Sequence, residues 1–156
     1  MTYLKCPKKS ILPKAQQSLW PLLCQVPESF VLCGGTAIAL YLGHRESIDF
    51  DFFSFESIDP DRLLSKLDFL KAAKVIQREQ NTLTCLIDFG GPVQVSFFGL
   101  PKLGLILEPL VIQENGLKIA SLLDLGGMKA SVVQKRAEYK DYVDLYSLLI
   151  QTKIYI

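Results

Sequence analysis

The chain of 156 residues is poor in the residues that build metal clusters and basic surfaces. It has one histidine, and its four cysteines form no Cys-x-x-Cys pair, so a zinc site is an unfavourable interpretation. The net charge is +1, so no large basic field marks a nucleic-acid-binding protein, although a local basic patch needs no such excess. No run of about 18 apolar residues occurs, so we expect no membrane span.

The composition is that of a folded domain. Hydrophobic residues make up 49% of the chain and charged residues 21%, which is unlike a disordered segment. The length suits one domain with its own core. We therefore expect a single domain over 1–156, with a core at about 10–115 and a C-terminal helical part at about 116–156.

Cysteine use and the N-terminus both bear on the compartment. The apolar surroundings of Cys24, Cys33 and Cys85 favour reduced thiols packed in the core. Secreted domains of this size more often pair their cysteines, and the opening MTYLKCPKKS lacks the apolar run of a signal peptide. We expect a cytoplasmic protein.

Hydrophobic periodicity and turn residues predict the order of secondary structure. Helices are predicted over 13–26, 36–43, 59–71, 121–136 and 140–151, and strands over 30–35, 47–55, 73–80, 82–89, 93–99 and 117–120. Pro21 is expected to bend or divide the first helix and Gly43 to end the second. Asp59 and Ser121 are expected to cap the third and fourth helices. Three strands in succession with short connections predict an antiparallel meander, and the whole order predicts an α+β or mixed α/β domain.

Two aspartates interrupt an apolar strand in the sequence SIDFDFFSF (47–55). Alternation along a strand places Ser47, Asp49 and Asp51 on one face and the intervening apolar residues on the other. Two carboxylates roughly 6–7 Å apart repel each other unless a charge neutralises them, and a hard divalent cation does so well. The alternative is an exposed strand face with two solvated acids, but the apolar flanks favour a metal site.

A pair of glycines precedes these acids by about one short helix. In CGGTAIAL, an apolar strand runs into Gly34 and Gly35 and then into a helix. Backbone N–H groups at such a helix start bind anions, and glycine lets a phosphate approach closely. Thr36 is a candidate both to cap the helix and to contact a phosphate. A structural turn is the alternative for the glycines alone, but a phosphate turn followed by a metal strand suits nucleotidyl transfer.

These motifs carry a resemblance to a known family. A Gly-Gly pair, about a dozen residues and then Asp-Phe-Asp resembles the signature of the DNA polymerase beta nucleotidyltransferase superfamily. More closely, GGTAIAL and LGHRESIDFDFF, followed late by DLGGMKA and RAEYKDYVDLYSLL, resemble the AbiEii/AbiGii toxins of abortive-infection and type IV toxin–antitoxin systems. The resemblance spans about Phe30 to Leu149. It implies a nucleotidyltransferase fold with a small mixed sheet flanked by helices and two C-terminal helices.

A lysine lies in the apolar arc of the helix predicted over 121–136. On a helical wheel, Lys129 falls in the middle of the arc that four apolar residues share. One interpretation is a side chain that snorkels at the domain edge, and the other is a cation directed at a nucleotide phosphate. The resemblance maps the family's lysine onto Lys129. Arg136 is expected either to serve the same cleft or to pair with Glu138.

Two aspartates open the last helix. Leu145, Leu148 and Leu149 mark its expected buried arc, with Asp141 between them on the wheel and Asp144 at the margin. Asp141 either caps the helix or, as the resemblance implies for its KDYVDL motif, belongs to the active site. We favour Asp141 as the catalytic residue and assign Asp144 to nucleotide binding.

The loop before the two acids adds further candidates. We assign Arg45 and Ser47 to nucleotide binding, as contacts for the triphosphate and the metal site. His44 is expected to be structural or an anion contact, with acid–base catalysis as the alternative. Lys140 is a further candidate for phosphate or substrate contact.

One departure from the superfamily concerns a third carboxylate. Polymerase-beta-type catalysts commonly carry an acid on a later, neighbouring strand, whereas the strand here offers Gln94 and Ser96. Asp88 is a distant substitute, although a turn role beside Gly90 and Gly91 is favoured. The general base therefore stays open.

The sequence thus predicts a metal-dependent nucleotidyltransferase of the EC 2.7.7 class. It would transfer a nucleoside monophosphate from an NTP to a tRNA or protein acceptor, with Mg²⁺ or Mn²⁺ at Asp49 and Asp51. Gly34, Gly35 and Thr36 would hold phosphates. As the resemblance implies, it would be a toxin with a cognate antitoxin protein. The alternatives are a catalytically weak nucleotide-binding module and a toxin-like interaction protein.

Overall fold

An eight-stranded mixed sheet forms the centre of the molecule, in the order β1-β7-β8-β2-β3-β6-β5-β4. The coordinates are a computed structural model that describes residues 1–136 and 138–153, so positions 137 and 154–156 of the predicted single domain lie outside the described residues. The strands are β1 (Tyr3–Leu4), β2 (Phe30–Cys33), β3 (Phe50–Ser54), β4 (Lys74–Glu79), β5 (Thr82–Asp88), β6 (Pro92–Gly99), β7 (Leu110–Ile112) and β8 (Lys118–Ile119).

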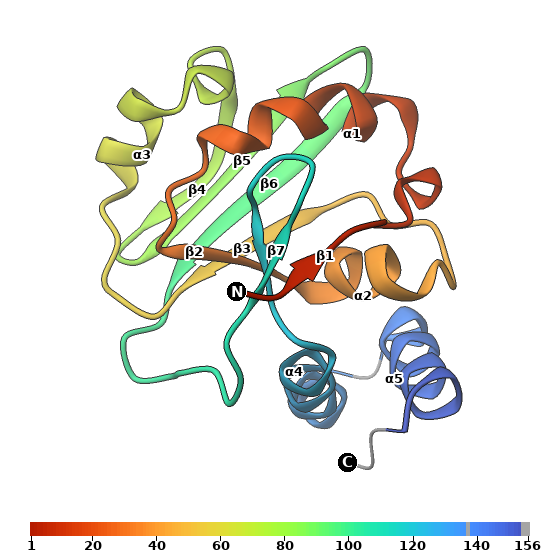
Figure 1. The fold of residues 1–156 in the computed structure, drawn as a ribbon. Coiled ribbons are helices and arrows are strands. Elements are labelled where there is room, and N and C mark those ends of the chain that lie inside the picture. Colours follow the sequence, from red (N-terminus) through yellow and green to blue (C-terminus); the bar gives the residue numbers. More distant parts are fainter. Residues whose placement is uncertain (137, 154–156) are drawn as a thin grey trace.

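Helices cover both sides of this sheet. They are α1 (Lys14–Leu19), α2 (Gly34–Leu42), α3 (Pro60–Lys66), α4 (Leu122–Lys135) and α5 (Tyr139–Gln151), with 3₁₀ helices over Lys9–Ile11, Trp20–Gln25 and Asp68–Leu70. Figure 1 shows α1 and α3 on one side and α2, α4 and α5 on the other. The mixed α/β architecture with two C-terminal helices is therefore confirmed.

The local signals in the sequence locate most element ends. Pro21 lies where α1 gives way to the 3₁₀ helix, as its missing N–H requires. Gly43 ends α2 in the left-handed conformation, with φ 64°. The Asp59 carboxylate accepts hydrogen bonds from two N–H groups in the first turn of α3, and Ser121 caps α4. The third helix ends early, because Leu67 is extended and separates α3 from a short 3₁₀ turn.

Strand pairing places β3 at the centre of the sheet. β4, β5 and β6 form the predicted antiparallel meander. β3 pairs in parallel with β6 and antiparallel with β2, which pairs in parallel with β8. All four residues of β2 are buried, in keeping with its continuous apolar run. The strand end that leads into α2 therefore lies beside β3.

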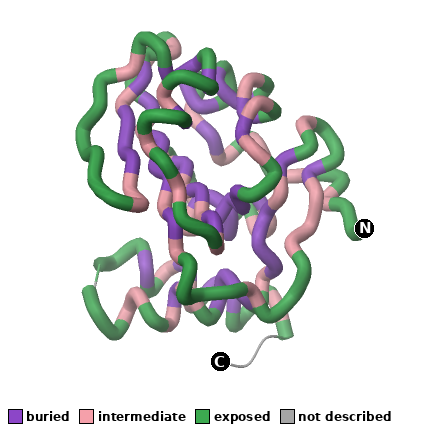
Figure 2. Tube along the Cα trace, turned by 90° about the vertical axis from the view of Figure 1, so that its left-hand side faces the viewer, coloured by how far each residue is buried: buried purple, intermediate pink, exposed green. Residues whose placement is uncertain are grey.

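The two faces of β3 have different neighbours. Phe50 and Phe52 are fully buried on the core face, where Phe52 stacks on Phe97 of β6 at 5.4 Å between ring centroids. Trp20 approaches Phe50 at 6.4 Å from the α1 side. Ile48, expected on this apolar face, precedes the strand and is 52% exposed. Figure 2 shows the buried residues gathered in the interior, with exposed segments around them.

Two expectations about the interior are tested here. Cys33 and Cys85 are buried free thiols, but Cys24 is exposed on the 3₁₀ helix, so its predicted core position is wrong. Its surroundings in sequence are apolar, yet the helix turns Cys24 outward, as it does Pro21. Within 1–136 and 138–153, no helix is long and apolar enough to cross a membrane.

Candidate active site

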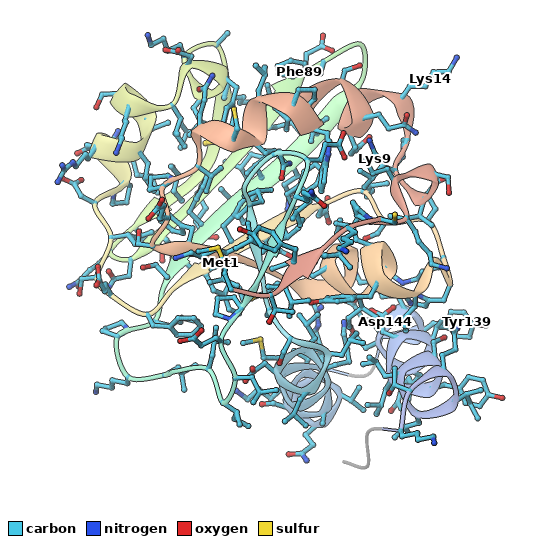
Figure 3. The ribbon with its side chains drawn as sticks, viewed as in Figure 1. Met1, Lys9, Lys14, Phe89, Tyr139 and Asp144 are labelled. Carbon is cyan, nitrogen blue, oxygen red and sulfur yellow. The ribbon has the colours of Figure 1, made fainter. Side chains whose placement is uncertain are left out.

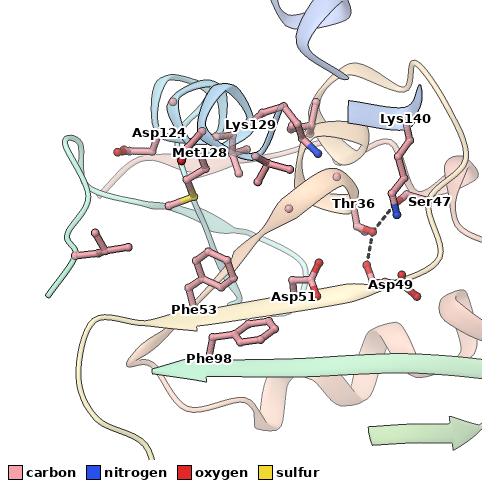
Figure 4. A pocket seen from close by; sticks show the side chains of 18 of the residues that line it. Thr36, Ser47, Asp49, Asp51, Phe53, Phe98, Asp124, Met128, Lys129 and Lys140 are labelled. Atoms are coloured by element: carbon pink, nitrogen blue, oxygen red, sulfur yellow. Dashed lines mark hydrogen bonds between the residues drawn. The ribbon is translucent and has the colours of Figure 1, made fainter. Parts of the chain in front are cut away.

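The acids Asp49 and Asp51 lie in the wall of a cavity of about 850 Å³ between β3, α2, α4 and the start of α5 (Figure 4). No group in the described part of the chain donates a hydrogen bond to either carboxylate. Burial and the neighbouring charge of Asp49 raise the pKa of Asp51 to about 6, against the opposing pull of Lys140, Lys129 and other cations. This pair is the arrangement that a divalent cation would neutralise.

The two glycines are required by side chains that approach them. Gly34 has φ 75°, and a Cβ there would lie 2.8 Å from Asp51 Oδ2. A Cβ on Gly35 would lie 2.2 Å from Arg45 Nη2. No side chain caps α2, so its first-turn N–H groups keep their capacity to bind an anion. The turn therefore brings an acid, a guanidinium and a helix start together.

Thr36 has a different role from the predicted helix cap. Its hydroxyl donates to the carbonyl oxygen of Asp49 and forms a 2.6 Å hydrogen bond with the hydroxyl of Ser47. Both hydroxyl residues are buried, while Cys33 occupies the cap position without a side-chain bond. The cap prediction for Thr36 is wrong because α2 begins two residues earlier than expected. Thr36 and Ser47 instead fix the backbone that carries Asp49.

Lys129 is buried between two carboxylates. Its Nζ lies 2.8 Å from Asp141 Oδ1 and 3.0 Å from Asp144 Oδ2, and its side chain is 7% exposed. The snorkelling interpretation is therefore wrong, because the ammonium points inward from α4. Lys129 also lines the cavity, so its charge reaches the site while its hydrogen bonds go to α5.

The Asp144 carboxylate contacts three basic side chains, two from the loop after α2 and one from α4. Arg45 donates from Nε and Nη2 to its two oxygens, at 2.6 and 2.9 Å, and His44 Nε2 lies 2.6 Å from Oδ1. Burial alone would raise the pKa of Asp144, but the hydrogen bonds from Arg45, His44 and Lys129 hold it far below its usual range. Figure 3 shows Asp144 on the side of α5 that faces α2. His44 is thus a structural partner of this carboxylate.

Asp141 and Asp144 lie behind the cavity wall. Both side chains are fully buried and neither lines the cavity, but both are ion-paired with residues that do, Lys129 and Arg45. Their roles in catalysis and nucleotide binding stay predictions. Asp141 does not cap α5, because the cap position belongs to Glu138. Burial works against charge at Asp141 too, yet the Lys129 hydrogen bond and the cations around it lower its pKa.

The buried face of α5 is more polar than the predicted leucine arc. Asp141, Asp144, Ser147 and Leu148 are buried, whereas Leu149 is 44% exposed. The acids take buried positions because Lys129 and Arg45 neutralise them there.

Two further cations line the cavity near its acidic end. Arg136 Nε lies 3.4 Å from Asp141 Oδ2, and its Nη1 lies 3.7 Å from Glu138, so it faces the cleft and also pairs with that glutamate. Lys140 extends from α5 toward Ser47 and Asp49 (Figure 4). Both predicted phosphate candidates thus lie at the cavity.

The position on β6 where the superfamily commonly carries a third acid is occupied by a serine. Ser96 of β6 is in register with Asp51, and its hydroxyl is 3.1 Å from that of Thr84. The Asp88 carboxylate accepts hydrogen bonds from the N–H groups of Gly90 and Gly91 in the turn before β6, which is the favoured turn role, and it does not line the cavity that holds Asp49 and Asp51.

Asp124 is a cavity residue that the sequence analysis missed. Its carboxylate accepts from Ile106 N at 2.7 Å, Leu107 N at 3.1 Å and Ser121 Oγ at 2.8 Å. It is 5% exposed and ties the connection between β7 and the preceding β6 to the start of α4. The spacing Ser121-x-x-Asp124 at a helix start is the signal that was available.

Residues 23–154 match the model of the nucleotidyl transferase AbiEii toxin family of type IV toxin–antitoxin systems. The chain belongs to this family. It is also 34% identical, over 122 residues, to an uncharacterised protein of Aquifex aeolicus (strain VF5), covering 77% of this chain and 57% of that protein. The chain thus spans less than two thirds of the length of this relative.

Solved structures share the fold. A candidate nucleotidyltransferase from H. pylori superposes with a TM-score of 0.63 at 20% identity, covering 86% of this chain and 65% of that one. An antigenic nucleotidyltransferase-like protein from Paracoccidioides brasiliensis superposes with a TM-score of 0.60 at 19% identity, covering 90% of this chain and 78% of that one. The antibiotic-resistance factor ANT(2'')-Ia superposes with a TM-score of 0.58 at 11% identity, covering 93% of this chain and 85% of that one. At these identities the likeness establishes the nucleotidyltransferase-like fold.

Proposed function

We propose that this chain transfers a nucleoside monophosphate from an NTP to a tRNA or protein acceptor. Asp49 and Asp51 would hold Mg²⁺ or Mn²⁺. The observation that carries the proposal is a pair of carboxylates that accept no hydrogen bond from any residue described in the structure and that face a cavity also lined by Arg45, Lys129 and Lys140. Family membership supports the same chemistry.

The donor set fits a hard cation. Mg²⁺ typically takes one or two carboxylates and completes its shell with waters and substrate phosphates. Within the described residues, no group of three or more His, Cys, Asp and Glu side chains forms a metal cluster, so the protein offers a two-carboxylate site. When bound, the metal would neutralise charge on the triphosphate and orient it for in-line attack.

Each of the chain's own groups has a role in this proposal. The first-turn N–H groups of α2 would bind phosphate oxygens, because they lack a side-chain cap. Lys140 and Arg136 would contact the leaving pyrophosphate from the opposite wall. Arg45, held by two hydrogen bonds to Asp144, keeps its charge beside Gly35. Lys129 and Asp141 position the helices that carry these cations.

A transfer assay tests this proposal. Purified protein is incubated with each α-³²P-labelled NTP, Mg²⁺ and either tRNA or host lysate, and label on macromolecules is measured. Asp49→Asn and Asp51→Asn should each reduce transfer by at least about a hundredfold, since each removes a charge that the metal requires. Asp68→Asn, at an exposed carboxylate that pairs with Lys71, is the matched control. Equal transfer by all four proteins would refute the site.

A second candidate function is nucleotide binding without transfer. Ser96 motivates it, because it stands beside Asp51 where the superfamily commonly carries a third acid. If NTP binding depends on both aspartates while no acceptor takes up label, the binding module is the better description.

We further propose that the chain acts as a toxin restrained by a cognate antitoxin protein. The type IV family supports this assignment. Induced expression should slow growth of the host, and Asp49→Asn should abolish the effect at equal protein level. Growth arrest that persists in Asp49→Asn would favour the toxin-like interaction protein instead.

A further inference from the structure

The cavity has two unlike ends. One end carries the carboxylates and cations described above. The other end is built from five apolar residues on four segments, which we call the aromatic end: Phe53, Phe98, Leu103, Ile106 and Met128. Figure 4 shows Phe53 and Phe98 on neighbouring strands, with Met128 extending toward them from α4. Phe53 lies two residues beyond Asp51 on the same face of β3, so the two ends are continuous.

The two rings suit a flat ligand. Phe53 and Phe98 are partners in the parallel register of β3 and β6, with centroids 5.5 Å apart and planes at 88°. Both are half-buried, so part of each ring faces the cavity. A planar group can therefore stack on one ring and meet the edge of the other, which are the two arrangements aromatic groups favour. The Met128 thioether is a flexible, polarizable lid for such a group.

The outer wall is apolar and held in place. Leu103 and Ile106 line the cavity yet are 62% and 74% exposed, so the wall offers apolar surface that a ligand would cover. The backbone N–H groups of Ile106 and Leu107 donate to the buried Asp124 carboxylate. Asp124 also accepts from Ser121, so its oxygens are already satisfied. Asp124 thus fixes the wall, and the surface that the five residues of the aromatic end offer to a ligand is apolar.

We propose that the aromatic end binds the nucleobase of the NTP by stacking, and that Asp124 is the positioning residue for its wall. This inference rests on the proposed function. Stacking accepts every base, because each has a π-face, and it gives only modest preferences. We therefore expect the four NTPs to bind within about tenfold of one another, with purines ahead of pyrimidines.

Binding measured with and without a base tests the inference. Calorimetry on the full chain with Mg²⁺ compares α,β-methylene ATP, whose cleavable bond is blocked, with inorganic tripolyphosphate, which has no base. Phe98→Leu should weaken the nucleotide by about five- to a hundredfold, the range for one base stack, and leave tripolyphosphate unchanged. Phe89→Leu, the same substitution on the far side of the molecule in Figure 3, should change neither.

Asp124→Asn separates positioning from simple stability. Its amide nitrogen would face an N–H group of the wall, so nucleotide affinity should fall several-fold with tripolyphosphate affinity unchanged. Equal losses for both ligands in Phe98→Leu and Asp124→Asn would overturn the inference, as would tripolyphosphate binding as tightly as the nucleotide in the wild type. Failure of the wild type to bind either ligand would instead refute the proposed function.

Discussion

At the scale of single residues, the Asp51 carboxyl makes the stability of the metal-free protein depend on pH. Its pKa of about 6 in the folded chain exceeds the ordinary 3.8, so between these values the folded state holds a proton that the unfolded state has released. Stability contributed by this group is present below the lower value and is lost as pH rises through about 6. Between pH 4 and 7, the free energy of unfolding of the wild type should therefore fall by up to about 2 kcal/mol relative to that of Asp51→Asn.

Urea unfolding in EDTA across that pH range measures this difference. Adding Mg²⁺ should close the gap at pH 7, because the cation replaces the proton. A pH-independent difference between the two proteins would show that Asp51 is not the titrating group.

Gly35 gives a second prediction at this scale. Gly35→Ala places a Cβ 2.2 Å from Arg45 Nη2, so the guanidinium must leave Asp144 and its two hydrogen bonds. We expect a loss of about 3 kcal/mol in the free energy of unfolding. Gly127→Ala is the matched control, because its new Cβ meets no described atom within 4 Å apart from its chain neighbours and the backbone of its own helix, and alanine favours the helix by about 1 kcal/mol. A smaller loss for Gly35→Ala than about 1 kcal/mol would contradict the packing described.

Site residues that lie close together in the sequence could be predicted from their spacing, whereas contacts between residues far apart in the sequence could not. Gly34 and Asp51 are linked through one strand, one helix and a loop, so a pattern of a few residue types locates them. Arg45 and Asp144 are 99 positions apart, and no pattern in either segment of the sequence indicates that the two residues contact each other. The spacing Ser121-x-x-Asp124 indicated a helix start, but nothing in the sequence indicated that Asp124 also accepts hydrogen bonds from the backbone N–H groups of Ile106 and Leu107.

At the scale of elements, α4 and α5 are joined to the site by charge. Lys129→Met leaves Asp141 without its ammonium partner in a fully buried position. We expect a loss of about 3–5 kcal/mol, the usual cost of removing one member of a buried ion pair. Lys135→Met on the exposed face of the same helix should change stability by less than about 0.5 kcal/mol.

A double variant checks that charge is the cause. Lys129→Met/Asp141→Asn removes the carboxylate that Lys129→Met leaves without its ammonium partner, so it should recover about half of the loss, in a thermodynamic cycle from urea unfolding. If the two single losses simply add, packing rather than charge joins α4 to α5.

Helices and strands were predicted correctly where their hydrophobic periodicity was long or where a proline, a glycine or a capping residue marked their ends. Pro21, Gly43 and Asp59 marked ends by backbone chemistry and were correct. β1 and β7 were not foreseen, because strands of two and three residues carry no periodic signal and exist through pairing with distant segments. On α5 the wheel placed Asp141 and Leu148 correctly on the buried side, but Leu149 is exposed, and Asp144, expected at the margin, is fully buried because its partners lie on other elements.

At the scale of the whole molecule, the site is a seam between the sheet and the C-terminal helices. α2 packs on β2 and β3 from one side and on α4 and α5 from the other. The carboxylates of Asp51 on β3 and of Asp49 just before it line the same cavity as cations from α4 and α5. A ligand that bridges both walls therefore contacts parts of the chain that are about 90 residues apart in sequence, Asp51 and Lys140 among them.

That bridging predicts a thermal shift that requires metal and nucleotide together. At a hundredfold excess over its dissociation constant, a ligand stabilises the folded state by about 2.7 kcal/mol, or roughly 5–10 °C for a chain of this size. Differential scanning fluorimetry should give this shift with Mg²⁺ and α,β-methylene ATP. EDTA should abolish it, because the triphosphate alone brings negative charge to Asp49 and Asp51. Asp49→Asn should lose most of the shift, whereas Asp68→Asn should keep it. A full shift in EDTA would mean that the nucleotide binds without a metal at these two aspartates.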